Sequence, residues 1–266
     1  MSIFFIQGYN ALMKSALTIA GADPTGGAGL QADLKVFRAF GVHGLSVATA
    51  LTAQNTTGVN SILPVDDIFF ERQMDALLKD IRPEALKTGM LYSKRAVHVI
   101  DGKIKKYALK KLVIDPVTVS SSGMSLAEDG MLDAMKERLF PLAKVVTPNI
   151  YEAAVLTGMN IEDIADMEKA AVRLKEMGPE FVIITGGHLE KSAIDLYYDG
   201  SGFCMIESEK IAGEYHGTGC AFSAAVTALL ANGYEPLESA KKAKEYVTSA
   251  IRNAYYLGKG MGLLNL

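Results

Sequence analysis

The chain has 266 residues, of which 49% are hydrophobic and 21% charged, and its formal net charge is −3. This composition is typical of a compact globular protein, and the small negative charge provides no broad basic surface for a nucleic acid. No apolar run approaches the roughly 18 residues that cross a bilayer, and the N-terminal apolar segment is too short for a signal peptide. We therefore expect a cytoplasmic protein without nucleic-acid or membrane partners.

Short segments rich in apolar and β-branched residues alternate with helical patterns along most of the chain. They predict strands over residues 16–20, 45–51, 85–88, 112–114, 144–147 and 181–185. Helical patterns follow the first three of them, over residues 30–40, 68–78 and 94–100. Repeated strand–helix units are typical of parallel strands joined by right-handed crossovers. The sequence therefore predicts an α/β fold with a mostly parallel central sheet.

The last part of the chain departs from this alternation. Segments 194–198 and 203–207 flank a glycine-containing turn and predict an antiparallel hairpin at one edge of the sheet. Two further helices are expected over 221–231 and 236–255. Since no linker, repeat or low-complexity tract interrupts the chain, we expect a single domain over residues 14–266. Residues 1–13 precede the first strand and are interpreted as an N-terminal appendage, whose order the sequence leaves open.

The glycine-rich stretch 21–29 follows the first expected strand. Residues 27–32 formally satisfy the dinucleotide pattern G-x-G-x-x-G/A, but six residues separate this pattern from the strand, and no acidic residue ends the second strand to bind a ribose. A nicotinamide-dependent dehydrogenase is therefore poorly supported. A loop whose glycines let the backbone approach a small ligand fits better, with a purely structural turn as the alternative.

Gly217-Thr218-Gly219-Cys220 opens an expected helix, where unpaired N–H groups and the helix dipole would hold anionic oxygens. It is not a P-loop, because no lysine follows the glycines. The same dipole should lower the pKa of the Cys220 thiol, and a thiolate there could accept the proton of a hydroxyl that attacks a phosphoryl group. The motif alone leaves open the alternative that Cys220 is a small buried hydrophobic residue.

Two further stretches place carboxylates after strands. Asn149-Ile150-Tyr151-Glu152 has the spacing of a helix capping box, and this structural interpretation is favoured for the stretch taken alone. Its position still allows Glu152 to hold hydrated Mg²⁺ beside a polyphosphate. Asp115 ends a strand at a place where a carboxylate gains nothing from packing. Both side chains are therefore candidates for a site at the carboxyl ends of the strands.

Together these stretches resemble the hydroxymethylpyrimidine and hydroxymethylpyrimidine-phosphate kinases of thiamine biosynthesis, within the ribokinase-like superfamily. The similarity runs from about Ala16 to the end of the chain. Its landmarks are residues 16–35, Ala53-Gln54-Asn55-Thr56, Lys87-Thr88-Gly89-Met90-Leu91, Ile114-Asp115-Pro116-Val117, Thr147-Pro148-Asn149 with Glu152, and His216-Gly217-Thr218-Gly219-Cys220. The resemblance implies a three-layer α/β/α fold and a homodimer.

The resemblance also implies a reaction. ATP would phosphorylate the hydroxymethyl oxygen of 4-amino-5-hydroxymethyl-2-methylpyrimidine and then the resulting monophosphate, with Mg²⁺ as cofactor. Carried over by position, the residues that would contact the pyrimidine are Gly21, Asp33, Gln54 and Met90. The transferring phosphoryl group would lie at Gly217, Thr218 and Gly219, with Cys220 as the base. ATP and Mg²⁺ would be organised by Asp115, Asn149, Glu152 and Thr185, with Asp115 and Glu152 as the metal candidates.

Two alternative functions remain. A pyridoxal kinase is built on the same scaffold, and Thr185 stands where many pyrimidine-phosphate kinases carry lysine. Gln54 favours the pyrimidine, because an amide can donate to a ring nitrogen and accept from the exocyclic amine beside it. A non-catalytic pyrimidine-binding regulatory protein is the alternative of another class, but such a protein would have little reason to keep Cys220, its neighbouring glycines and the acidic residues together.

Overall fold

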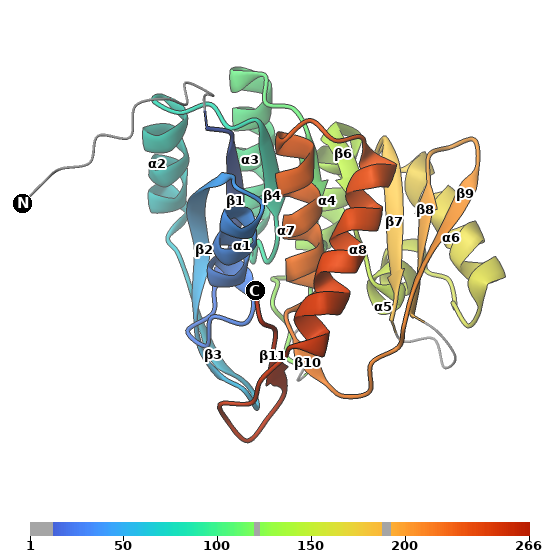
Figure 1. Cartoon of the computed structure of the whole chain (residues 1–266). Coiled ribbons are helices and arrows are strands. Elements are labelled where there is room, and N and C mark those ends of the chain that lie inside the picture. Colours follow the sequence, from blue (N-terminus) through green and yellow to red (C-terminus); the bar gives the residue numbers. More distant parts are fainter. Residues whose placement is uncertain (1–12, 120–122, 188–192) are drawn as a thin grey trace, which may run out of the picture.

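The computed structural model describes residues 13–119, 123–187 and 193–266. A nine-stranded sheet runs through these residues in the order β3-β2-β1-β4-β5-β6-β7-β8-β9 (Figure 1). The strands are β1 (Ser15–Ala22), β2 (His43–Asn55), β3 (Gly58–Pro64), β4 (Ala85–Thr88), β5 (Leu112–Ile114), β6 (Ala143–Val146), β7 (Phe181–Gly186), β8 (Ala193–Tyr198) and β9 (Phe203–Ser208). Neighbouring strands in the central part of this order, β2-β1-β4-β5-β6-β7, pair in parallel. At the two edges, β3, β8 and β9 pair antiparallel.

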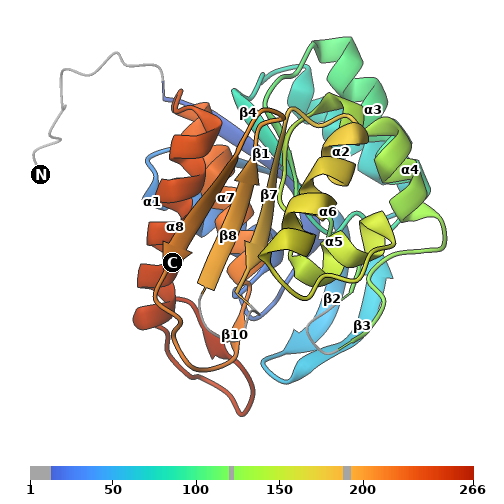
Figure 2. The ribbon, with the colours of Figure 1, turned by 90° about the vertical axis from the view of Figure 1, so that its right-hand side faces the viewer.

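Helices cover both faces of this sheet. They are α1 (Gly29–Ala39), α2 (Asp67–Leu78), α3 (Lys94–Tyr107), α4 (Met131–Arg138), α5 (Ile150–Thr157), α6 (Ile164–Glu176), α7 (Thr218–Ala231) and α8 (Pro236–Arg252), with a short 3₁₀ helix, η1 (Phe140–Leu142). Figure 2 shows α1, α7 and α8 on one side of the sheet and α2 to α6 on the other. None of the helices in the described residues is long and apolar enough to cross a membrane.

The core is divided by the sheet into two apolar layers. Successive residues of a strand point to opposite faces, so Leu17 and Ile19 of β1 pack in the layer beneath α2 to α6, while Ala16 packs in the layer beneath α1, α7 and α8. Both faces of the central strands are therefore covered, which explains why these strands are apolar at almost every position.

Helix α7 lies over the middle of the sheet, between α1 and α8. Every residue from Ala221 to Ala231 is buried, and five of the first eight in that stretch are small. Small side chains let the α7 backbone approach β1, β4 and β5 closely. This packing brings the N-terminus of α7 to the edge of the sheet where the parallel strands end, which is where the site lies.

The structure confirms the predicted fold: a three-layer α/β/α arrangement with a mostly parallel sheet and the β8–β9 edge hairpin. It also has elements whose ranges the sequence did not predict, among them β3, α6 and a small parallel pair, β10 (Tyr215–His216) with β11 (Gly262–Leu263). The expected helix over 236–255 ends earlier, at Arg252. Apart from Met13, the predicted N-terminal appendage lies outside the described residues.

Candidate active site

A cavity of about 690 Å³ lies at the carboxyl ends of the parallel strands. It has the size of a pocket for a small ligand. Segments that are distant in sequence line it: the loop after β1, the end of β2, the residues that follow β4, β5, β6 and β7, and the first turn of α7. β10 and β11 lie at the same edge, at the bottom of the view in Figure 1. The fold therefore places the site where an open parallel sheet binds its ligands.

The first turn of α7 and the loop after β1 meet backbone to backbone. Gly217 is the N-cap of α7 and has φ of 81°, a conformation that favours glycine. A Cβ atom on Gly217 would lie 1.8 Å from the carbonyl oxygen of Gly27, so no other residue fits there. The residues from Gly217 to Cys220 all line the cavity. The close contact between Gly217 and Gly27 thus joins the turn that is predicted to bind anionic oxygens to the loop after β1.

A buried charge cluster lies beneath this turn. The ammonium of Lys87, on β4, is 2.6 Å from Oδ1 of Asp33 and 3.7 Å from Oδ2 of Asp115, and it donates to the carbonyl oxygen of Cys220 at 3.3 Å. Oδ2 of Asp115 also accepts from the Ser223 hydroxyl at 2.8 Å. Burial opposes the charge on Lys87, but the charges around it outweigh burial and raise its pKa. Lys87 is therefore a fixed cation directly below the start of α7.

The structure does not support the low pKa that the sequence predicts for Cys220. Burial of the sulfur raises its pKa to about 12, and the negative charges of Asp115 and Asp33 act in the same direction. The Lys87 charge and a hydrogen bond from the Gly29 N–H lower the pKa of Cys220, but they offset this rise only in part. Desolvation of the thiol and the two nearby carboxylates therefore act against the lowering of the pKa that the helix N-terminus predicts. Cys220 is nevertheless not packed in hydrocarbon, because it lines the cavity above Lys87.

Three of the four residues predicted to contact the pyrimidine line the cavity: Gly21, Gln54 and Met90. Gly21 and Gln54 lie at irregularities of their strands. β1 has a register shift between Ala20 and Ala22, and β2 has one between Ala53 and Gln54. Such bulges change the direction in which a side chain points. In the sequence, the signals for these two positions were a glycine and a polar residue, which a regular strand would not explain.

The prediction for Asp33 needs correction. Its carboxylate is fully buried and accepts from the Thr18 hydroxyl at 2.6 Å and from Lys87. It is not among the residues that line the cavity. Asp33 is on α1, whose buried face packs against β1, so its side chain reaches the interior of the protein and not the ligand space. Its role in this structure is to hold Lys87.

Asn149 and Glu152 form the capping box that the sequence predicted. Oδ1 of Asn149 accepts from the Glu152 N–H at 2.9 Å, and Oε2 of Glu152 accepts from the Asn149 N–H at 2.9 Å. Both residues also line the cavity. Burial raises the pKa of Glu152 to about 8, and the charge of Asp115 adds to this shift. The cap therefore holds a carboxyl group whose ionisation depends on its surroundings in the site.

The same region tests whether a divalent cation would fit. Burial also raises the pKa of Asp115, so two buried carboxyl groups disfavour each other's charge, and a cation would relieve this repulsion. Their oxygens are suitable ligands for Mg²⁺. Among the described residues, however, no group of three or more His, Cys, Asp or Glu side chains could hold a metal ion. Thr185 lines the cavity beside them, and its N–H donates to the Pro148 carbonyl at 2.9 Å.

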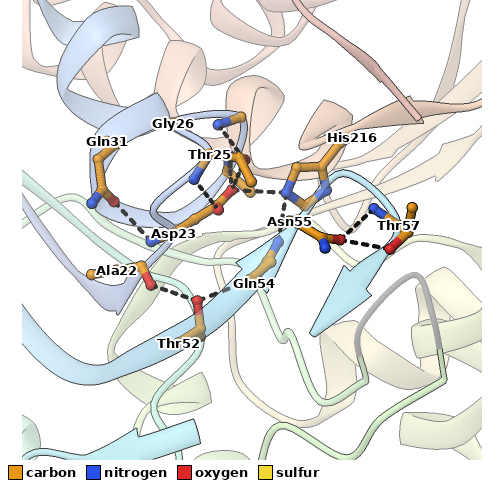
Figure 3. A network of polar contacts seen from close by, with 12 residues as sticks. Ala22, Asp23, Thr25, Gly26, Gln31, Thr52, Gln54, Asn55, Thr57 and His216 are labelled. Atoms are coloured by element: carbon orange, nitrogen blue, oxygen red, sulfur yellow. Dashed lines mark hydrogen bonds and ion pairs between the residues drawn. The ribbon is translucent and has the colours of Figure 1, made fainter. Parts of the chain in front are cut away.

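Sequence reasoning gave no role to several residues of the site: Lys87, Ser223, Asp23 and His216. Lys87 had a local signal, because a lysine in the middle of a short apolar strand must find a buried partner. For Asp23 and His216 no signal could be read, since 193 residues separate them in the chain. The His216 side chain contacts both Asp23 and Gln54 at the cavity wall (Figure 3).

The family model for phosphomethylpyrimidine kinase matches residues 23–265 of this chain. A curated relative, the hydroxymethylpyrimidine/phosphomethylpyrimidine kinase of Bacillus subtilis, is 42% identical over 94% of this chain and 93% of its own length. The thiamine biosynthesis bifunctional protein ThiED of Geobacter sulfurreducens is 46% identical over 94% of this chain. The chain spans about half, 52%, of that relative's length.

Solved structures agree with this similarity. The pyridoxal kinase from Staphylococcus aureus, in complex with AMP-PCP and pyridoxal, superposes with a TM-score of 0.89 at 38% sequence identity. The match covers 95% of this chain and 93% of that one.

Proposed function

The chain belongs to the phosphomethylpyrimidine kinase family, and from that premise we propose that it transfers a phosphoryl group from ATP to 4-amino-5-hydroxymethyl-2-methylpyrimidine and then to its monophosphate. The product would be the diphosphate that serves thiamine biosynthesis. One observation carries the proposal: a single cavity holds the Gln54 amide, the N-terminus of α7 and the Asp115–Glu152 carboxyl groups. These are the three elements that an acceptor ring, a migrating phosphoryl group and a nucleotide phosphate require.

The acceptor ring would lie between Gln54 and Met90. The Gln54 amide offers both a donor and an acceptor, and Met90, which is 8% exposed, offers an apolar surface. Gly21 forms the wall behind Met90, since a Cβ atom on Gly21 would come within 3.0 Å of the Met90 sulfur. The missing side chain at Gly21 therefore leaves room for the ring and for Met90 together.

The phosphoryl group would be held at the N-terminus of α7. The N–H groups of the first turn and the helix dipole stabilise the charge that spreads over the phosphoryl oxygens. Cys220 would accept the hydroxyl proton, and Lys87 would stabilise the thiolate from below. Since burial raises the pKa of the Cys220 thiol, proton transfer belongs late in the step, when the new oxygen–phosphorus bond makes the hydroxyl proton acidic.

Asp115 and Glu152 would hold Mg²⁺, largely through water and the ATP phosphates, since the described residues supply few direct protein ligands. Bound there, Mg²⁺ would supply neutralisation of phosphate charge. Asn149 keeps Glu152 in place through the capping box. Thr185 provides a neutral side chain at this end of the cavity, where a lysine would add a positive charge.

The role of Cys220 is tested by substitution. We expect Cys220→Ala to lower kcat about 10²- to 10⁴-fold while the dissociation constant for the pyrimidine changes little, because the group removed acts on a proton in the transition state. Cys220→Asp should recover part of the activity. Cys204→Ala on β9 is the control, since Cys204 lies outside the cavity lining. Unchanged kcat in Cys220→Ala would remove the sulfur from the mechanism.

The reaction itself is tested by comparing turnover of hydroxymethylpyrimidine, its monophosphate and pyridoxal with Mg-ATP. The similarity to a pyridoxal kinase makes pyridoxal the second candidate substrate. We expect higher kcat/KM for both pyrimidines, because pyridoxal lacks the paired amine and ring nitrogen that an amide recognises. Faster turnover of pyridoxal would reverse the assignment. Binding of the pyrimidine without any ATP consumption would instead support a regulatory protein.

We also propose a homodimer in the cytoplasm. β3 is an edge strand, and Leu63 on β3 is 66% exposed opposite Leu51 on β2, which is 49% exposed. An apolar pair on an open edge is a suitable surface for a second copy. Leu63→Glu should convert a dimer into a monomer in light scattering. A wild-type mass equal to one chain would contradict the proposal.

A further inference from the structure

The ring of His216 has two polar neighbours at the same nitrogen. Its Nε2 lies 2.8 Å from Oδ2 of Asp23 and 2.9 Å from the amide nitrogen of Gln54 (Figure 3). All three side chains line the cavity, and those of His216 and Asp23 are almost fully buried. One nitrogen cannot donate to a carboxylate and accept from an N–H at once. This conflict determines how the Gln54 amide must be oriented.

Asp23 fixes the proton of the ring. Burial opposes its negative charge, but hydrogen bonds from His216 and Thr25 outweigh burial and lower its pKa, so the carboxylate only accepts. It also accepts from the backbone N–H groups of Thr25 and Ala28, both at 2.9 Å. His216 Nε2 therefore carries the hydrogen and donates. The Gln54 atom beside it must then be the carbonyl oxygen, since the two ends of an amide have nearly the same shape and the network decides between them.

The contacts at the other end of the Gln54 amide independently require the same orientation. The Thr52 hydroxyl lies 3.0 Å from the Ala22 carbonyl oxygen and 3.3 Å from the second terminal atom of Gln54. A hydroxyl has one hydrogen, and the carbonyl, which can only accept, takes it. The atom of Gln54 next to Thr52 must therefore donate, so it is the amide nitrogen. His216 at one end of the Gln54 amide and Thr52 at the other therefore require the same orientation of that amide.

The backbone holds the ring in this place. His216 belongs to β10, and it pairs with Leu263 of β11 near the C-terminus. Nδ1 of His216 is buried without a hydrogen-bond partner among the described residues. The strand pairing thus keeps Nε2, which donates to Asp23, next to the Gln54 amide.

We propose that His216, oriented by Asp23, is a positioning residue that fixes the Gln54 amide with its oxygen toward His216 and its nitrogen toward Thr52. The cavity then presents one acceptor and one donor in a set order. A 4-aminopyrimidine matches this order, because its amine donates to the oxygen and its adjacent ring nitrogen accepts from the amide nitrogen. The 4-oxo counterpart reverses it, because its carbonyl accepts and its ring N–H donates. This inference rests on the proposed function.

The test compares kcat and KM for 4-amino-5-hydroxymethyl-2-methylpyrimidine and for its 4-oxo counterpart. Wild type should prefer the amino compound. His216→Phe keeps a ring but loses the donor, so the amide can turn and the preference should shrink about tenfold or more, mainly through KM. His216→Gln retains a side-chain N–H and should restore most of the preference. Melting temperatures of the variants report whether each one folds.

The outcomes separate this inference from the function on which it rests. Wild type that phosphorylates neither pyrimidine contradicts the proposed function. Equal losses for both compounds in His216→Phe, with an unchanged preference, contradict the positioning role alone. If His216→Phe does not fold, Gln54→Glu serves instead, because a carboxylate in place of the amide removes the donor end. Its preference for the amino compound should also shrink, and an unaltered preference would overturn the inference.

Discussion

At the scale of single residues, Cys220 shows that two local effects of opposite sign act on one sulfur. The N-terminus of α7 favours a thiolate, whereas burial next to Asp115 and Asp33 favours the thiol, and burial dominates. Lys87 reduces the difference but is largely neutralised by its own carboxylate partner, Asp33. These effects make the proton on Cys220 hard to remove, and the charge of Lys87 is what opposes them.

This balance predicts slow alkylation of Cys220. In a Cys204→Ser variant, which leaves Cys220 as the sole cysteine, the rate with iodoacetamide should rise with pH without a plateau up to at least about pH 10, because only the thiolate reacts and its pKa is raised to about 12. The rate is followed by mass spectrometry of the intact protein, with denatured protein as the reference. A plateau near neutral pH would show that the helix dipole dominates after all.

At the scale of elements, the start of α7 depends on glycine for two different reasons. Gly217 has a positive φ and meets the Gly27 backbone, whereas a Cβ atom on Gly219 would have no atom within 4 Å. The two glycines of one short motif therefore have different physical requirements. Gly217 is needed to form the turn, and Gly219 leaves space in the cavity for a ligand.

The two glycines should respond differently to the same substitution. Gly217→Ala should lower the free energy of unfolding by about 2 kcal/mol or more, because the added methyl group must displace the Gly27 carbonyl. Gly219→Ala should leave stability unchanged or raise it slightly, since alanine favours helix, but should weaken ATP binding. Urea denaturation and calorimetric titration measure the two effects. Equal stability losses would contradict this distinction.

The cap of α5 allows a structural role and a functional role to be separated. Asn149→Ala should cost about 1 kcal/mol of stability through the lost cap and should also lower kcat, since Asn149 lines the cavity and holds Glu152. Asp163→Ala is the matched control: Asp163 caps α6 through the Asp166 N–H and lies outside the cavity lining. It should lose similar stability with unchanged kcat. If kcat is unchanged in both, Asn149 is only a cap.

At the scale of the whole molecule, the C-terminal segment joins the β2–β3 turn to the site. The Met261 N–H donates to the Thr56 carbonyl at 3.0 Å, and β11, which begins at the next residue, pairs with β10, which carries His216. The end of the chain thus connects the turn after Gln54 with the strand before the first turn of α7. Residues that are far apart in sequence are held in one wall of the cavity by this contact.

Gly260→Ala should disturb this wall without unfolding the protein. A Cβ atom on Gly260 would lie 1.9 Å from the Thr56 carbonyl oxygen, so the C-terminal segment must move away. We expect KM for the pyrimidine to rise about tenfold, with a change of only a few degrees in Tm. Gly202→Ala in the β8–β9 turn, where the added atom meets nothing within 4 Å, is the control. Unchanged KM would show that the contact does not affect the site.

The sequence by itself determined the alternation of strands and helices, the edge hairpin, the glycine segments and the capping box, because each depends on residues close together in the chain. Only the tertiary structure decided which of these residues share a cavity. It placed Asp33 behind Lys87, raised the pKa of Cys220 and brought His216 to Gln54. Burial and long-range pairing set these properties, and both arise when segments as distant as residues 23 and 216 come together on folding.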